Sequence, residues 1–116
     1  MKEINIGGKQ IRVRATPLAL LRYKQEFQTD LVGDMLKMND IEKEPSRIDS
    51  VVLMQIIWAM AKADAGLGNT FPSFEKWLSG MDYFDMSDSG LWQAIMEEAA
   101  DGFFRRGTQQ QKPKEK

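Results

Sequence analysis

The sequence predicts a mainly helical protein with a small N-terminal β-hairpin, an α+β fold in which the hairpin packs on a bundle of about four to five helices. Apolar residues alternate with polar ones over residues 2–15 and recur every three or four positions over residues 17–104. Residues 48–65 are apolar in almost every direction, which is typical of a helix buried on several sides. We therefore expect a central apolar helix at 48–65 with the other elements around it.

One domain is the expectation for a chain of 116 residues. We expect this globular domain to cover residues 1–106, with the hairpin at 2–15 and the helices at 17–104. Residues 107–116 carry no apolar side chain able to dock and are rich in lysine and glutamine. The sequence predicts a disordered basic tail there.

The hairpin is predicted as two strands, at about 2–6 and 9–15. Ile4, Ile6, Ile11 and Val13 alternate with polar residues on either side of Gly7-Gly8, a pair that supplies the positive backbone angles of a tight turn. A phosphate-binding loop is the less favoured interpretation of this pair, because neither further glycines nor a Lys-Ser/Thr pair follows. The apolar face of an isolated hairpin must be covered, and helices are all that follow.

Helix starts are indicated by capping residues. Thr16-Pro17 is predicted to begin the first helix, with the threonine side chain as its cap, and Thr29 or Asp30 the second. Ser46, with Asp49 three residues later, resembles a capping box ahead of the central helix.

The central helix is predicted to end at Gly66–Asn69, whose residues tolerate a left-handed cap. We expect Met54 and Trp58, inside this helix, to lie in the core. A short helix is expected from Pro72 and Ser73 to about Gly80, followed by a connector over 81–85.

The last helix is predicted from Ser87 or Asp88 to Phe104. Glu97 and Glu98 within it are expected to face solvent, because two adjacent carboxylates on a helix suit a solvated face better than an acid/base pair.

Catalysis is not expected, and neither a cofactor nor a metal is implied. The sequence contains no cysteine and no histidine, which removes disulfides, zinc sites of the Cys/His type and histidine-based triads. Asp82, Asp85 and Asp88 recur every three residues, but calcium loops need a different spacing. The nucleophile elbow, the phosphate-binding loop and the dinucleotide fingerprint are also missing from the sequence.

We expect a cytoplasmic protein. The longest nearly apolar run, Val51–Ala61, is well short of the roughly 20 residues of a membrane span, and the first residues alternate instead of forming the apolar core of a leader.

Charge is distributed unevenly along the chain, although the net charge is only −1. Residues 1–24 carry six basic and one acidic side chain, residues 25–104 five and fifteen, and residues 105–116 five and one. The acidic body argues against binding of nucleic acid phosphates by the fold. A small nucleic-acid-associated or regulatory protein that uses Lys9, Arg12, Arg14 and the basic tail remains an alternative.

Eight methionines and three tryptophans are many for a small domain, and they either fill the core or form an adaptable binding surface. We expect a partner surface at the helix ends, above all on the last helix. The residues proposed for it are Met35, Met38, Met86, Met96, Phe103 and Phe104.

A specific resemblance emerges from the order of these segments. A hairpin leads into Thr16-Pro17, and residues 22–31 read Arg-Tyr-Lys-Gln-Glu-Phe-Gln-Thr-Asp-Leu. A long alanine-bearing helix, the segment Pro72–Leu78 with the pattern Pro-x-Phe-x-x-Trp-Leu, and a short final helix follow. In this order the chain resembles, over residues 1–104, the tail assembly chaperones of long-tailed, siphovirus-type phages and prophages of Gram-positive bacteria. Gln28, where the family often has glycine, and the variable insertion at 39–47 depart from the pattern.

The resemblance implies a non-enzymatic assembly factor. Such a protein binds the helical tape measure protein, keeps it soluble and helps tail tube (major tail) protein polymerise around it in the cytoplasm of the bacterial host, without remaining in the mature virion. The family commonly makes a longer frameshifted form, which would be a further partner. A structural tail component is another alternative.

Overall fold

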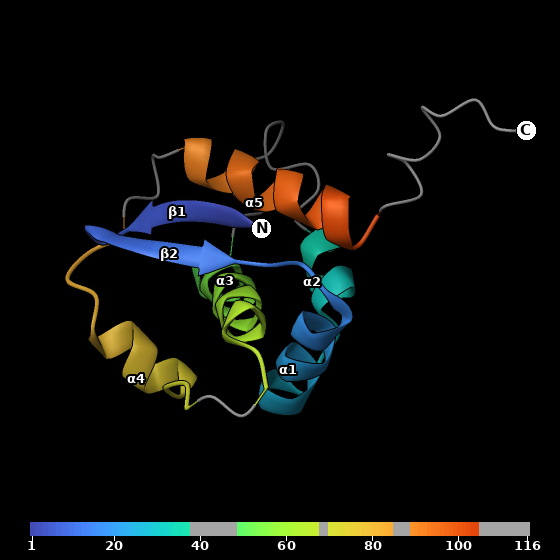
Figure 1. The fold of residues 1–116 in the computed structure, drawn as a ribbon, viewed down its shortest axis with the longest axis horizontal. Helices are drawn as coiled ribbons and strands as arrows, with labels where there is room; N and C mark the ends of the chain where they lie inside the picture. Colours follow the sequence, from blue (N-terminus) through green and yellow to red (C-terminus); the bar gives the residue numbers. More distant parts are fainter. Residues whose placement is uncertain (38–48, 68–69, 85–88, 105–116) are drawn as a thin grey trace, which may run out of the picture.

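Two strands and five helices make up the described part of the chain in the computed structural model, which covers residues 1–37, 49–67, 70–84 and 89–104 (Figure 1). The elements are β1 (Lys2–Ile6), β2 (Lys9–Val13), α1 (Pro17–Phe27), α2 (Leu31–Lys37), α3 (Ser50–Ala65), α4 (Phe74–Ser79) and α5 (Ser89–Gly102). The predicted fold class is confirmed: the protein is mainly helical with an N-terminal hairpin. Within these ranges no helix combines the length and the apolar character of a membrane span.

The hairpin forms around the predicted turn. β1 and β2 are antiparallel, with Ile4 opposite Ile11, and both turn glycines have positive φ, 57° at Gly7 and 80° at Gly8. A Cβ at Gly7 would lie 2.7 Å from the carbonyl oxygen of Tyr83, so this turn also needs a residue without a side chain.

β2 ends at Val13, two residues earlier than predicted, because the next two amides leave the hairpin. The Arg14 amide donates to the carbonyl oxygen of Met60 in α3, and the Ala15 amide donates to the Glu98 carboxylate in α5. These bonds tie the end of the hairpin to the two helices beside it.

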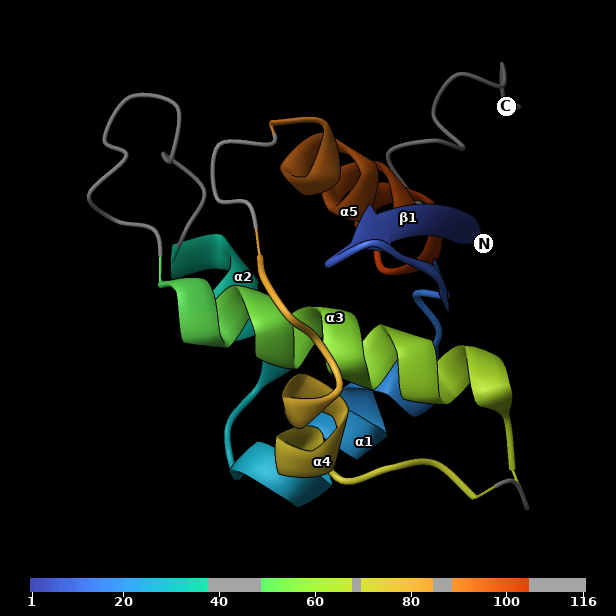
Figure 2. The same cartoon turned by 90° about the vertical axis from the view of Figure 1, so that its left-hand side faces the viewer.

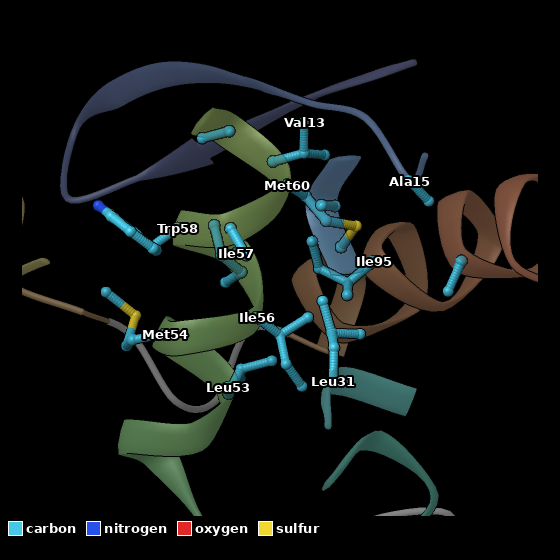
Figure 3. Close-up of a cluster of buried hydrophobic side chains, with 14 of the residues drawn as sticks. Val13, Ala15, Leu31, Leu53, Met54, Ile56, Ile57, Trp58, Met60 and Ile95 are labelled. Carbon is cyan, nitrogen blue, oxygen red and sulfur yellow. The ribbon is translucent and has the colours of Figure 1, made fainter. Parts of the chain in front are cut away.

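α3 is the central element, as predicted. In Figure 2 it crosses the molecule with β1 and α5 on one side and α1 and α4 on the other. Nine of its sixteen residues are buried, including Met54 and Trp58, which confirms the expected core positions. Figure 3 shows Val13 of β2, Leu31 of α2 and Ile95 of α5 among the side chains of α3. Burial on several sides explains why the residues of this helix are apolar all round.

Two of the predicted helix caps are wrong. The side chain of Thr16 makes no capping hydrogen bond, so α1 begins with the favourable backbone angle of Pro17 and a bond from the Ala19 amide to the Thr16 carbonyl. At α3 the cap is Asp49 itself, whose carboxylate accepts from two amides of the first turn, and the helix begins at Ser50 instead of 48. The proposed Ser46 cap lies outside the described residues.

The remaining helix ends agree more closely with the expectations. Asp30 accepts from the Gly33 amide at the start of α2, and Ser73 accepts from the Lys76 amide at the start of α4. Gly66 ends α3 with φ 85°. α5 ends at Gly102, two residues before the predicted Phe104. The predicted start of this helix at 87–88 and the predicted tail at 107–116 lie outside the described residues.

Glu98 corrects the expectation that both carboxylates of the last helix face solvent. It is only 3% exposed, and its carboxylate accepts from the Ala15 amide at 2.9 Å and pairs with the Met1 amino group at 3.0 Å. Glu97 is exposed and pairs with Lys2. Adjacent positions on a helix point about 100° apart, so one carboxylate turns inward to satisfy a buried amide while its neighbour stays in solvent.

Candidate functional site: an apolar groove

The structure removes one of the six partner-binding residues predicted from the sequence. Met35 is 1% exposed and belongs to the core, so its side chain is not available at the surface. Met96 and Phe103 are partly buried and pack against the core, and Phe104 is 40% exposed. Met38 and Met86 lie outside the described residues. At the end of α5, Phe104 is therefore the most exposed of these six candidates that the structure describes.

Two basic residues of the hairpin share one carboxylate of α3. Arg12 and Arg14 each place Nε 3.2 Å from an oxygen of Asp64, which is mostly buried. Asp64 offsets one of the two positive charges, and both arginine side chains remain about half exposed. The ion pairs therefore reduce the positive charge that the nucleic-acid alternative requires, without removing it.

A groove of about 290 Å³ opens between the N-terminal part of α3, α4 and the segment 81–84, which in Figure 2 crosses α3 beside α4. Val51 and Tyr83 are 54% and 60% exposed. Seven of the nine residues that line the groove are apolar or aromatic, so it can hold apolar side chains of a partner. The nine are Ser50, Val51, Met54, Phe74, Leu78, Met81, Asp82, Tyr83 and Phe84.

The wall of the groove is held in place by an aromatic cluster behind it. The ring of Phe74 lies 5.0 Å from that of Phe27 and 6.1 Å from that of Trp58, and the Trp58 indole N–H donates to the carbonyl oxygen of Pro72 at 3.1 Å. These contacts fix α4 against α3 and α1. None of the six residues of α4 is buried, and two of them, Phe74 and Leu78, line the groove.

Among the described residues around the groove, carboxylates outnumber cations. Asp82 belongs to the lining, the Asp49 carboxylate lies 3.1 Å from the Val51 amide, and Glu75 is exposed beside Phe74. Among the lining residues that the structure describes there is no lysine or arginine. Lys9 is a nearby cation, since its ammonium would lie 3.3 Å from a Cβ at Gly80, directly before the segment 81–84. The groove thus combines an apolar interior with an edge where carboxylates are in excess.

A second cluster of polar side chains is buried between α1, α2 and α3. The Tyr23 hydroxyl donates its one proton to Oδ2 of Asp34 at 2.7 Å, and the side-chain amide of Gln55 lies 3.1 Å from the same hydroxyl oxygen. The pKa of Tyr23 is raised above its usual value, mainly by burial and to a smaller extent by the hydrogen bond to Asp34. Since this hydroxyl is fully buried and neutral, the cluster serves to join helices. Across the described ranges, no three acidic side chains converge into a group that could hold a metal ion.

Comparisons of the chain with family models, with curated proteins and with solved structures give no match. The site therefore stands on its own geometry. Sequence reasoning missed the groove because residues 81–85 were interpreted only as a connector. The available signal was that Met81, Tyr83 and Phe84 put three large apolar side chains into four residues, more than a simple connector needs.

Proposed function

We propose that this protein is a phage tail assembly chaperone. It binds the helical tape measure protein, keeps it soluble and promotes polymerisation of tail tube protein around it, without catalysis. The observation that carries the proposal is the open apolar groove, because a chaperone for a helical client needs an exposed surface that accepts apolar side chains.

The segments that carry the family resemblance support this assignment. Residues 22–31 run from α1 into the start of α2, and Pro72–Leu78 supplies α4, one wall of the groove. Of these segments, Phe74 and Leu78 line the groove, and Phe27 packs behind Phe74. Met54 and Met81 add flexible side chains to the lining, which suits a client with many different apolar segments.

The proposal places the protein in the cytoplasm of the bacterial host. Its partners there are the tape measure protein, the tail tube protein and a longer frameshifted form of this chain. It acts during assembly and is not retained in the mature virion.

Co-expression tests the function directly. The tape measure protein of the same phage is expressed alone, with this chain, and with an unrelated small helical protein, and its soluble fraction is measured. We expect a severalfold increase only with this chain, together with co-purification of the two proteins. An unchanged soluble fraction beside a folded chain contradicts the proposal.

A further inference from the structure

We infer that the groove between α3, α4 and residues 81–84 binds an amphipathic helix that carries basic residues beside its apolar stripe. This inference rests on the proposed function and deepens it, since it names the surface that holds the client and the chemistry of the bound segment. It replaces the end of α5 as the expected client surface.

The shape of the groove fits the edge of a helix. Phe74 and Leu78 are four residues apart on α4, and Val51 and Met54 are three apart on α3, so each helix presents a short apolar ridge to the groove. A third helix with apolar residues at the same spacings can place its own ridge between them. A volume of about 290 Å³ accommodates a few side chains, and the rest of such a helix remains in solvent.

The charge of the rim determines which helix is favoured. Asp49, Glu75 and Asp82 lie in or beside the lining. Lys76 is the cation of α4, but it is two positions from both Phe74 and Leu78, roughly 160–200° round the helix, and so points away from the groove. Lys9 of the hairpin turn places its ammonium beside Gly80 and offsets part of the negative charge, which leaves the carboxylates in excess. Basic residues beside the apolar stripe of a partner meet carboxylates at close range, whereas acidic residues meet like charge.

Two synthetic peptides of about 18 residues test this chemistry. Both carry the same leucine stripe at helical spacing, and the remaining positions are lysine in one and glutamate in the other. Binding of the labelled peptides to the full chain is measured by fluorescence anisotropy. We expect the lysine peptide to bind at least tenfold more tightly, and to lose affinity as salt rises from about 50 to about 500 mM.

Two matched variants locate the binding surface. Val51→Glu places a charge in the groove, and Leu21→Glu places the same charge on α1 at a residue of similar exposure, 50% against 54%, that does not line the groove. We expect Val51→Glu to weaken binding of the lysine peptide at least tenfold and Leu21→Glu to leave it within twofold. A carboxylate at the half-exposed position 51 also adds negative charge to the edge. Val51→Asn, which removes apolar surface without adding charge, is therefore measured beside it, and the inference predicts weaker binding for both substitutions at this position. Circular dichroism checks that all three variants are folded.

Several results overturn the inference. Equal binding of the two peptides is one, and equal effects of Val51→Glu and Leu21→Glu on binding is another. A third is a dimer, seen by sedimentation, that only Val51→Glu dissociates, because the groove would then hold a second copy of this chain. Client rescue that is insensitive to Val51→Glu overturns the inference and leaves the proposed function standing. Peptide binding in the groove without any client rescue contradicts the proposed function instead.

Discussion

The hydroxyl of Tyr23 joins three helices through one buried oxygen atom, so removing that atom isolates its contribution. Tyr23 belongs to α1, and its two partners, Asp34 and Gln55, belong to α2 and α3. Tyr23→Phe keeps the ring and its contact with Phe27, whose ring centroid is 4.9 Å away.

The expected loss in free energy of unfolding follows from the Asp34 carboxylate, which the substitution leaves without its donor from Tyr23. A hydrogen bond to a charged group contributes about 1.5–3 kcal/mol, and the substitution leaves a mostly buried carboxylate without its shortest donor. Asp34 keeps a weaker bond from Thr29 at 3.3 Å and an ion pair with Lys37 at 3.7 Å. We therefore expect a loss of about 2 kcal/mol at neutral pH, or roughly 10 °C in melting temperature.

The difference between the two proteins is expected to depend on pH. Burial and the bond to Asp34 raise the pKa of Tyr23 in the folded protein above its usual value of 10.0. Its stabilisation is therefore complete below about pH 10 and is lost as pH rises further, because the unfolded chain releases a proton that the folded chain retains. Above pH 10 the wild type should lose up to about 1.4 kcal/mol per pH unit relative to Tyr23→Phe.

Urea denaturation between pH 7 and pH 11, followed by tryptophan fluorescence, measures both effects. Tyr83→Phe is the matched control, because this tyrosine is 60% exposed, and its stability should equal that of the wild type at neutral pH. A Tyr23→Phe variant as stable as the wild type at pH 7 would contradict the role of the hydroxyl. So would a difference in free energy of unfolding between the two proteins that does not narrow above pH 10.

Three further substitutions test local contacts by thermal or urea unfolding. Gly102→Ala should destabilise the protein by about 1–3 kcal/mol or more, since a Cβ there would overlap the carbonyl oxygen of Ala15; an unchanged melting temperature would contradict that close approach. Glu98→Ala should lower the free energy of unfolding by about 1–3 kcal/mol because it leaves the buried Ala15 amide unpaired. Glu97→Ala, on the exposed side, should lower it by under about 1 kcal/mol. Equal losses would contradict the inward placement of Glu98. Asp49→Ala removes the cap of α3 and should cost about 1 kcal/mol, and no loss would mean that the cap is not needed.

The parts of the fold that were predictable are those that depend on local pattern. Alternating apolar and polar residues on either side of Gly7-Gly8 indicate a hairpin, regardless of the element against which it packs. The apolar run of α3 likewise indicates a buried helix but does not show which elements surround it. The inward turn of Glu98 was not predictable, because its partner is the Ala15 amide, 83 residues away in sequence.

The candidate site was less predictable than the fold because three separate segments form it. Val51 on its own resembles a core residue of an apolar helix, and Tyr83 resembles a connector residue. Only their placement beside α4 makes a groove. Met35 shows the reverse error, since a methionine that suits a binding surface is equally suited to the core, and here it is buried.

The central claim is that the groove holds the client, and the most direct measurement is the soluble yield of tape measure protein co-expressed with the wild type, with Val51→Glu and with Leu21→Glu. We predict that the wild type and Leu21→Glu keep the client soluble and co-purify with it, while Val51→Glu, although folded, does neither. Full rescue of the client by folded Val51→Glu would contradict the claim.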